Sequence, residues 1–354
     1  TPYRFEGGTQ EAQVFFEDGM LESFQQVFKY ANNDFPVTVY YAYRQSETEA
    51  DEEGETVAST GWETMLSALI QAGFGITGTW PMRTELANRP TAFETNALAS
   101  SIVLVCRKRA EHASIITRRD FINQLKSELK PALTKLQQSN IAPVDMAQAA
   151  IGPGMAVYSR YAQVLEADGS PMSVRTALQL INQELDLFLN EQDGELDGGS
   201  RFCVDLFTQA GFNNIDYGVA DVLARAKNIS VERLAQEGVL VAEKGQVRLY
   251  TREELAAQNL SNASPVWMLA QQLTKAMESG GEQATAELIS KLSASKVEQA
   301  KALAYRLFSI ADRKGWAKEA FAYNTLVNGW KSVQATAADM RARAGEAQQG
   351  TLFD

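Results

Sequence analysis

The chain has 354 residues, of which 45% are hydrophobic, and a formal net charge of −11. This length is enough for two or three domains with ordinary buried cores. No run of eighteen apolar residues occurs, and the first residues lack a basic region followed by an apolar core. Neither a membrane span nor a signal peptide is therefore predicted, and we expect a cytoplasmic protein with no membrane partner.

The negative charge is concentrated near the N-terminus. Residues 1–105 hold 5 Lys and Arg against 15 Asp and Glu, whereas the remainder of the chain is almost neutral. Six of these carboxylates lie between Glu47 and Glu55, a stretch too polar and too like-charged to pack. It is predicted to be a solvated loop, and a metal-binding cluster is the alternative.

Cysteine and histidine are too sparse to favour metal chemistry. Cys106 and Cys203 stand about a hundred residues apart, and His112 is the single histidine. The pattern favours two reduced, buried thiols over a disulfide or a metal site. A histidine-dependent catalytic triad would have to use His112, because the chain has no other histidine.

The first third of the chain predicts helices and strands in alternation. An apolar stripe between Ala12 and Phe28 suits a helix that packs on a sheet. A strand is predicted at Val37–Tyr43, and a capped amphipathic helix begins at Thr60 and stops at Gly73. Two further strands are expected at Gly75–Trp80 and Ser101–Cys106.

The order strand, helix, strand, long loop, strand is the way many Rossmann-like methyltransferase domains finish. In that arrangement the last strand lies antiparallel between its two predecessors. The segment Gly73–Gly78 is rich in glycine, but it follows a helix and opens a strand. A nucleotide-binding turn needs the reverse order, so a tight helix-to-strand turn is favoured over a cofactor loop.

Longer motifs in the same region resemble a known family. They are Thr60–Glu63, Gly75–Glu85 and Thr95–Arg107, and a further stretch follows at Asn140–Tyr158. These segments resemble the adenine-specific DNA methylases whose family name mentions a zinc ribbon. The resemblance implies S-adenosylmethionine as cofactor and DNA as substrate. With only two distant cysteines, the zinc ribbon is not expected in this chain.

Two motifs that the family needs are missing from the sequence. We find neither an Asp/Asn-Pro-Pro-aromatic tetrapeptide nor a glycine-rich turn after an early strand. The resemblance therefore implies the C-terminal portion of a methylase, or one half of a split enzyme, which by itself is inactive. It would bind no cofactor alone and would partner an N-terminal half. The rivals are a non-enzymatic DNA-binding or adaptor subunit and a purely structural interaction protein.

The predicted fold class is α/β followed by mainly α. We expect the closing part of a methyltransferase sheet at 1–109, a helical domain at 110–199, a winged-helix-like module at 200–255, a helical bundle at 256–342 and a flexible tail at 343–354. Within 110–199, helices are expected at Asp120–Gln138, Ile141–Ile151 and Ser173–Leu189. The intervening Gly152-Pro-Gly154 is predicted to be a hinge, and a ligand-facing loop beside Tyr158 and Tyr161 is the alternative.

Basic and amide side chains in three places are candidates for DNA contact, through phosphates or base edges. Arg83 and Arg89, in the loop before the last strand, could instead pair with Glu85 and Glu94. The basic residues after that strand could instead be exposed to solvent without a partner. In the winged-helix-like module the positive charge permits DNA contact, with protein contact as the alternative. The candidates are Arg83, Arg89, Asn96, Arg107, Lys108, Arg109, Lys227, Arg233, Lys244 and Arg248.

The C-terminal tail resembles ligands of the bacterial sliding clamp. It ends in Gln348-Gln-Gly-Thr-Leu-Phe-Asp354, in which Gln349, Leu352 and Phe353 are the candidate partner-binding residues. A disordered tail without a partner is the favoured alternative.

Overall fold

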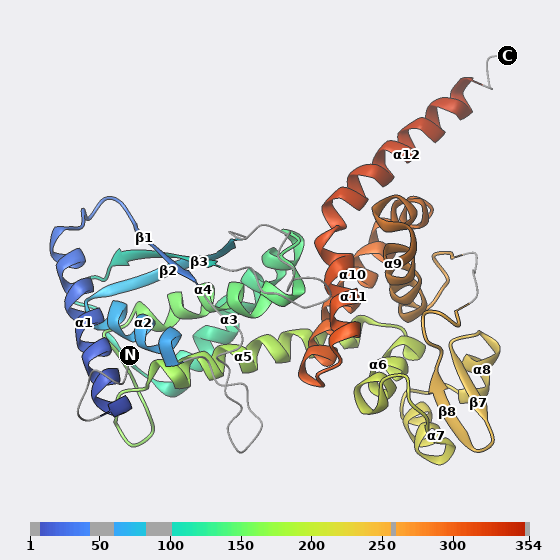
Figure 1. Ribbon diagram of the computed structural model, residues 1–354. Helices are drawn as coiled ribbons and strands as arrows, with labels where there is room; N and C mark the ends of the chain where they lie inside the picture. The colour runs from blue at the N-terminus through green and yellow to red at the C-terminus, as the bar shows by residue number, and fades with distance from the viewer. Residues whose placement is uncertain (1–7, 43–59, 83–100, 256–259, 351–354) are drawn as a thin grey trace. The chain divides into compact units, whose positions relative to one another are not determined.

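A computed structural model describes residues 8–42, 60–82, 101–255 and 260–350 (Figure 1). Contacts within the chain divide it into two compact units. Unit 1 comprises Thr1–Ala92, Ala97–Ser139 and Asp145–Phe188, and unit 2 comprises Phe93–Asn96, Asn140–Val144 and Leu189–Asp354. Each unit is described separately below. No helix in the described ranges is both long enough and apolar enough to cross a membrane.

Unit 1 is built on a three-stranded sheet in which β3 lies between β1 and β2 and runs antiparallel to both. Tyr40, Val103 and Trp80 occupy one row across the three strands, and β2 carries an irregularity between Ile76 and Gly78. The predicted insertion of the last strand between its predecessors is therefore confirmed. The elements are α1 (Gly8–Tyr30), β1 (Val37–Ala42), α2 (Thr60–Gln71), β2 (Phe74–Met82) and β3 (Ser101–Lys108).

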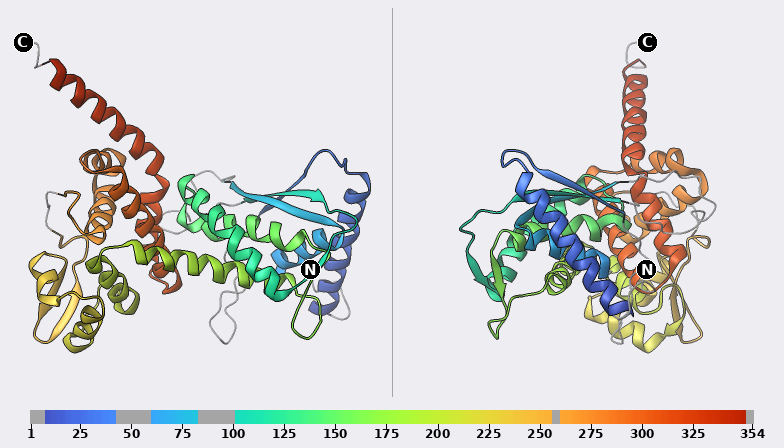
Figure 2. Two further views of the ribbon diagram at one scale, coloured as in Figure 1. Left: turned by 180° about the vertical axis from the view of Figure 1, so that it is seen from behind. Right: turned by 60° about the vertical axis from the view of Figure 1, so that its left-hand side comes forward.

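One face of this sheet is covered by α2 and by a later helix, α4 (Pro143–Ser159), as Figures 1 and 2 show. Ile102, Leu104 and Cys106 of β3 are fully buried on this face, and Val103, whose side chain points to the opposite face, is buried as well. The opposite face carries Tyr40 and Trp80, which are 66% and 61% exposed. The core under the sheet contains Trp62, Met65, Leu66, Leu69, Phe74, Ile76, Ile102, Leu104 and Cys106.

The turn from α2 into β2 depends on Gly73. Its φ of +103° is strained for any residue with a side chain, and a Cβ there would meet the Phe28 ring at 2.9 Å. Its carbonyl accepts the Arg109 backbone N–H at 2.9 Å. The predicted tight helix-to-strand turn is confirmed, and α1 packs against it through Phe28.

The predicted hinge at Gly152-Pro-Gly154 is wrong, because α4 runs through it. Pro153 has no N–H for the carbonyl of Ala149 one turn earlier, but that carbonyl accepts a hydrogen bond from the Thr79 hydroxyl at 3.3 Å. The two glycines allow close packing: a Cβ on Gly152 would meet Thr79 at 2.4 Å, and one on Gly154 would meet Ile181 at 2.4 Å. Gly152-Pro-Gly154, a sequence that usually breaks a helix, here lets α4 pack closely against Thr79 and Ile181.

The remainder of unit 1 is helical with a small parallel strand pair. β4 and β5 pair in parallel, and α3 begins at an N-cap, Thr117, whose side chain accepts the Asp120 N–H. Phe121, Leu125 and Leu129 are buried on one face of α3, as their spacing predicts. These elements are β4 (Ile115–Thr117), α3 (Arg118–Gln138), β5 (Gln163–Leu165) and α5 (Val174–Glu191).

Unit 2 begins with three helices and a hairpin. Ser230 caps the third helix by accepting the Arg233 N–H, and Gly238 follows the helix with φ +71°. The strand pair is joined by Lys244 and Gly245, both with positive φ. A short strand missed in the sequence, β6, pairs with β8, giving the order β6-β8-β7. The elements are η3 (Gln192–Glu195), α6 (Gly198–Ala210), β6 (Ile215–Asp216), α7 (Tyr217–Ala226), α8 (Val231–Gln236), β7 (Leu240–Glu243) and β8 (Gln246–Leu249).

Unit 2 continues with four helices packed around buried Trp267, Tyr323 and Trp330. The first of the four comprises two helical segments that meet at a kink at Gly281, where φ is +63°. The last helix continues to Gly350, so the tail predicted to begin at 343 is helical over its first eight residues. The helices are α9 (Val266–Ser290), α10 (Ala294–Arg313), α11 (Ala317–Asn328) and α12 (Trp330–Gly350).

Candidate functional site

The three basic residues at the end of β3 bind other parts of unit 1. The Arg107 guanidinium donates to the Asp34 carbonyl at 3.2 Å, and the Lys108 ammonium lies 4.8 Å from the centre of the Phe28 ring. Arg109 donates to the Tyr161 carbonyl at 3.3 Å. The segment is therefore an anchored part of unit 1, and its contact with DNA phosphates stays a prediction. Arg83, Arg89 and Asn96 lie outside the described residues.

Three of the four candidate DNA-binding residues in the 200–255 module are already in ion pairs. Lys227 lies 2.7 Å from Asp205, and Arg233 lies 2.7 Å from Glu237 in the next turn. Arg248 makes two hydrogen bonds to the Glu254 carboxylate, at 2.6 and 2.7 Å. These bonds lower the pKa of Glu254 to about 2. A DNA phosphate would have to compete with an internal carboxylate at each of these positions.

Lys244 differs from these three residues by its place in the fold. It occupies the exposed turn between β7 and β8, where its φ is +52°. The N–H of Tyr217, which opens α7, donates to the carbonyl of the adjacent Gly245 at 2.8 Å. The hairpin tip is therefore fixed against the start of α7.

Arg252, which adds to the positive charge of this module, is not available for DNA. It is 6% exposed and makes bidentate contacts with both Glu278 and Glu319. It also lies against the Tyr323 ring, 5.4 Å from the ring centre. Burial lowers its pKa, but Tyr323 and the two carboxylates more than offset this, so the pKa is raised. Arg252 is thus a buried link from the end of the hairpin to α9 and α11.

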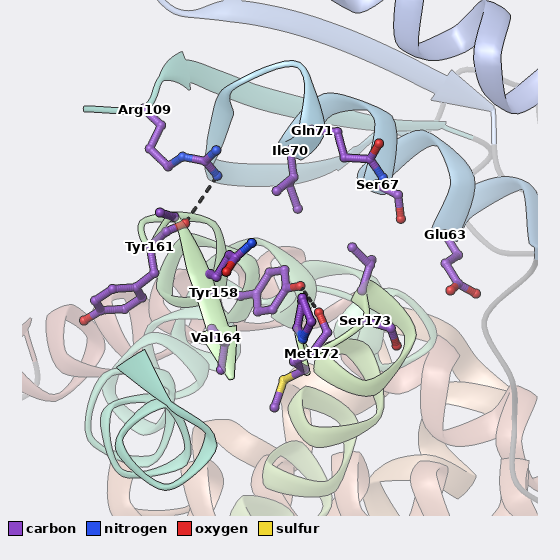
Figure 3. A pocket seen from close by; sticks show the side chains of 14 residues that line it. Glu63, Ser67, Ile70, Gln71, Arg109, Tyr158, Tyr161, Val164, Met172 and Ser173 are labelled. Atoms are coloured by element: carbon purple, nitrogen blue, oxygen red, sulfur yellow. Dashed lines mark hydrogen bonds between the residues drawn. The ribbon is translucent and has the colours of Figure 1, made fainter. Parts of the chain in front are cut away.

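A cavity of about 400 Å³ opens in unit 1 between α2, the end of α4 and the segments around β5 (Figure 3). Glu63 lines it and accepts a hydrogen bond from Arg175 at 2.8 Å. The Tyr158 hydroxyl donates to the Met172 carbonyl at 2.7 Å, and burial raises the Tyr158 pKa to about 12. Tyr158 and Tyr161 were the residues of the ligand-facing alternative in the sequence. They do line a cavity, although α4 contains no loop beside them.

The cysteines are both free and buried, as expected. Burial raises the pKa of Cys106 to about 12 and also raises the pKa of Cys203 well above its usual range. His112 is exposed. Within the described ranges no cluster of His, Cys, Asp and Glu suits a metal ion.

One of the three candidate clamp-binding residues lies in the last helix. Gln349 lies in the last turn of α12, and Leu352 and Phe353 lie outside the described residues. Their role stays a prediction.

Comparison with known proteins identifies one match. Residues 197–352 match a family model described as a domain of unknown function, DUF8807. The match begins at Asp197, the N-cap of α6, and includes both the hairpin module and the four helices joined to it by Arg252. It covers less than half of the chain. No curated protein matches the chain, and no solved structure matches it either.

Proposed function

We propose that this chain contributes the closing strands and the DNA-target-binding part of an S-adenosylmethionine-dependent DNA adenine-N6 methyltransferase. The observation that carries the proposal is the antiparallel placement of β3 between β1 and β2, which run parallel to each other and are joined through α2. Rossmann-like methyltransferase sheets close in this way, and the family resemblance of the sequence lies in the same segments. Fold alone would not name the reaction, so the proposal depends on both.

Two features of the sheet are consistent with further polypeptide beside it. Within the described part of the chain, β1 is an edge strand, and its sequence Val-Thr-Val-Tyr-Tyr-Ala contains no charge that would discourage pairing. On the sheet face away from α2 and α4, the large side chains of Tyr40 and Trp80 are mostly exposed to solvent. A donor-binding part of the enzyme would add strands next to β1 and cover this face.

The glycine-rich turn at Gly73 does not suit the methyl donor. The Gly73 turn leads from a helix into a strand, and the space where its Cβ would lie is occupied by the Phe28 ring. The donor and the catalytic tetrapeptide would be supplied by other polypeptide, in the same protein or in a separate subunit. The complete enzyme would transfer a methyl group to the exocyclic amine of an extruded adenine. A cytoplasmic location and binding of the sliding clamp through the tail belong to the same proposal.

For the DNA-binding part, we rely on the order of elements between α6 and β8. A helix, a short strand, two helices and a hairpin, with the short strand paired to the second hairpin strand, are typical of winged-helix modules. Lys244 at the hairpin tip is the basic residue best placed to touch a phosphate. Its contribution would be electrostatic and would weaken as salt rises.

Methyl transfer tests the proposal directly. The chain is mixed with a candidate donor-binding polypeptide, and tritiated methyl incorporation from S-adenosylmethionine into DNA is measured. Incorporation in the mixture and in neither component alone supports the proposal. A mixture that binds DNA but never methylates it contradicts the proposal.

The second candidate is a non-enzymatic adaptor that binds DNA or protein through the same module. The internal pairing of Lys227, Arg233 and Arg248 favours protein contact over DNA contact. Titration of the chain alone with fluorescent duplex DNA at several salt concentrations separates these possibilities. Salt-dependent binding without any methyl transfer favours a DNA-binding adaptor, and the absence of binding at low salt favours a protein-binding one.

A further inference from the structure

The cavity in unit 1 is elongated, with a different charged group at each end. Glu63, Ser67 and Gln71 line it from successive turns of α2, and eight residues of helix span about 12 Å. Arg109 lies at the Gln71 end, because its backbone N–H bonds to Gly73 directly after α2. Glu63 lies at the other end, beside Ser173 at the start of α5 (Figure 3).

The Arg109 end favours an anion. A guanidinium has five N–H donors, and the described structure gives Arg109 one acceptor, the Tyr161 carbonyl. Among the described residues no carboxylate lies within 4.0 Å of it. Within the described part of the chain Arg109 is therefore in no ion pair, and a phosphate could accept two of its remaining N–H groups in a bidentate manner.

The Glu63 end favours hydrogen-bond donors. Arg175 donates to Oε2 of Glu63 and balances its charge, and the other carboxylate oxygen of Glu63 can accept a hydrogen bond from a ligand. Ser173 adds a hydroxyl at the same end, although that hydroxyl already accepts the Thr176 N–H at 3.0 Å. A ligand with an amine or hydroxyl at this end would satisfy both groups.

The middle of the cavity suits a flat or apolar body. Val164 and Met172 are buried in its wall, and Ile70 and the Tyr158 ring project toward it. The Tyr158 hydroxyl is already bonded to the Met172 carbonyl, so the ring is held in place. Ligand sites of a few hundred Å³ commonly combine such apolar walls with a few polar groups.

We propose that this cavity binds a nucleoside monophosphate, with the phosphate on Arg109 and the base between Tyr158 and Ile70 toward Glu63. The volume exceeds what an inorganic anion fills, and the length allows a phosphate and a donor-bearing base to reach opposite ends. This site is independent of the proposed methyl transfer, because it uses none of the exposed sheet face or the 200–255 module.

Calorimetric titration of the full chain with AMP, adenosine and inorganic phosphate tests the site. We expect AMP to bind with a Kd below about 1 mM, and adenosine and phosphate each to bind at least about tenfold more weakly. Arg109→Gln is expected to weaken AMP binding by about tenfold, and Arg109→Lys by less, since the ammonium keeps the charge but not the bidentate geometry. Arg233→Gln is the matched control, because Arg233 is exposed, pairs with Glu237 and does not line the cavity.

A second variant tests the location without changing a charge. Ser67→Phe places a ring in the cavity from α2 and is expected to abolish AMP binding while the melting temperature stays within a few degrees of that of the wild type. The proposal is overturned if AMP does not bind at about 10 mM, if phosphate alone binds as tightly as AMP, or if both Arg109→Gln and Ser67→Phe bind AMP like the wild type.

Discussion

Replacing Arg252 with Met should destabilise unit 2 far more than the same change at Arg248. Both arginines make bidentate contacts with carboxylates, but Arg252 is 6% exposed, whereas the Arg248 side chain is 26% exposed. Methionine keeps most of the apolar stem, so the comparison isolates the guanidinium. The Arg252 variant leaves Glu319, whose side chain is 19% exposed, without its cation in a partly dry site.

The magnitude follows from the burial of each partner. Removing one member of a buried ion pair typically costs about 3–5 kcal/mol. Glu278 is 37% exposed and is screened by solvent, so we take the lower end and expect about 3 kcal/mol for Arg252→Met. For Arg248→Met we expect at most about 1 kcal/mol, as for other solvent-accessible pairs.

Urea unfolding followed by tryptophan fluorescence measures both values, since Trp267, Trp316 and Trp330 lie in unit 2. A double variant, Arg252→Met with Glu319→Gln, should recover about 1–2 kcal/mol because the stranded charge is gone. Equal losses of unfolding free energy for Arg252→Met and Arg248→Met would contradict this prediction. So would a double variant that loses more unfolding free energy than the two single variants lose together.

Three further predictions concern single groups. The folded-state pKa of Glu254 is depressed to about 2, so its small contribution to stability should be complete above about pH 5 and disappear as the pH falls toward 2. Denaturation of the wild type and of Glu254→Gln across this range should show the difference in their unfolding free energies falling to zero. A difference that does not change with pH would be inconsistent with the ion pair. Gly152→Ala should cost at least about 1–3 kcal/mol by overpacking against β2, whereas Gly218→Ala in α7, where a Cβ meets nothing within 4 Å, should be neutral or slightly stabilising in thermal unfolding. Cys106 and Cys203 should resist a thiol reagent at pH 8 in the folded protein and react fully in denaturant; rapid labelling of either thiol in the native state would contradict their burial.

The sheet of unit 1 could be predicted because its signals are local and periodic. The apolar spacing of α2 and the uninterrupted apolar run of β3 each specify one element. The turn at Gly73 follows from the change of period on either side of it. The strand order was expected by analogy with methyltransferase domains, and the observed order β1-β3-β2 agrees with it.

The errors arose where tertiary contacts override a local rule. Gly-Pro-Gly normally interrupts a helix, but the Thr79 hydroxyl replaces the hydrogen bond that Pro153 removes. Arg252 counts toward the positive charge of the 200–255 module, but a count of charged residues gives no information on its burial. Strand β6 has only two residues and no pattern that a sequence could show. For the cavity, the sequence indicated only Tyr158 and Tyr161, beside the glycine motif. Nothing in the sequence linked Arg109 or Glu63 to them.

The central claim is that β1, β2 and β3 are the closing part of a larger methyltransferase sheet. Hydrogen exchange measured by mass spectrometry on the chain, alone and in a mixture that methylates DNA, tests it most directly. We expect amides of Val37–Ala42, at the open edge of β1, to exchange at least about tenfold more slowly in the mixture. Unchanged exchange of this strand in a methylating mixture would contradict the claim.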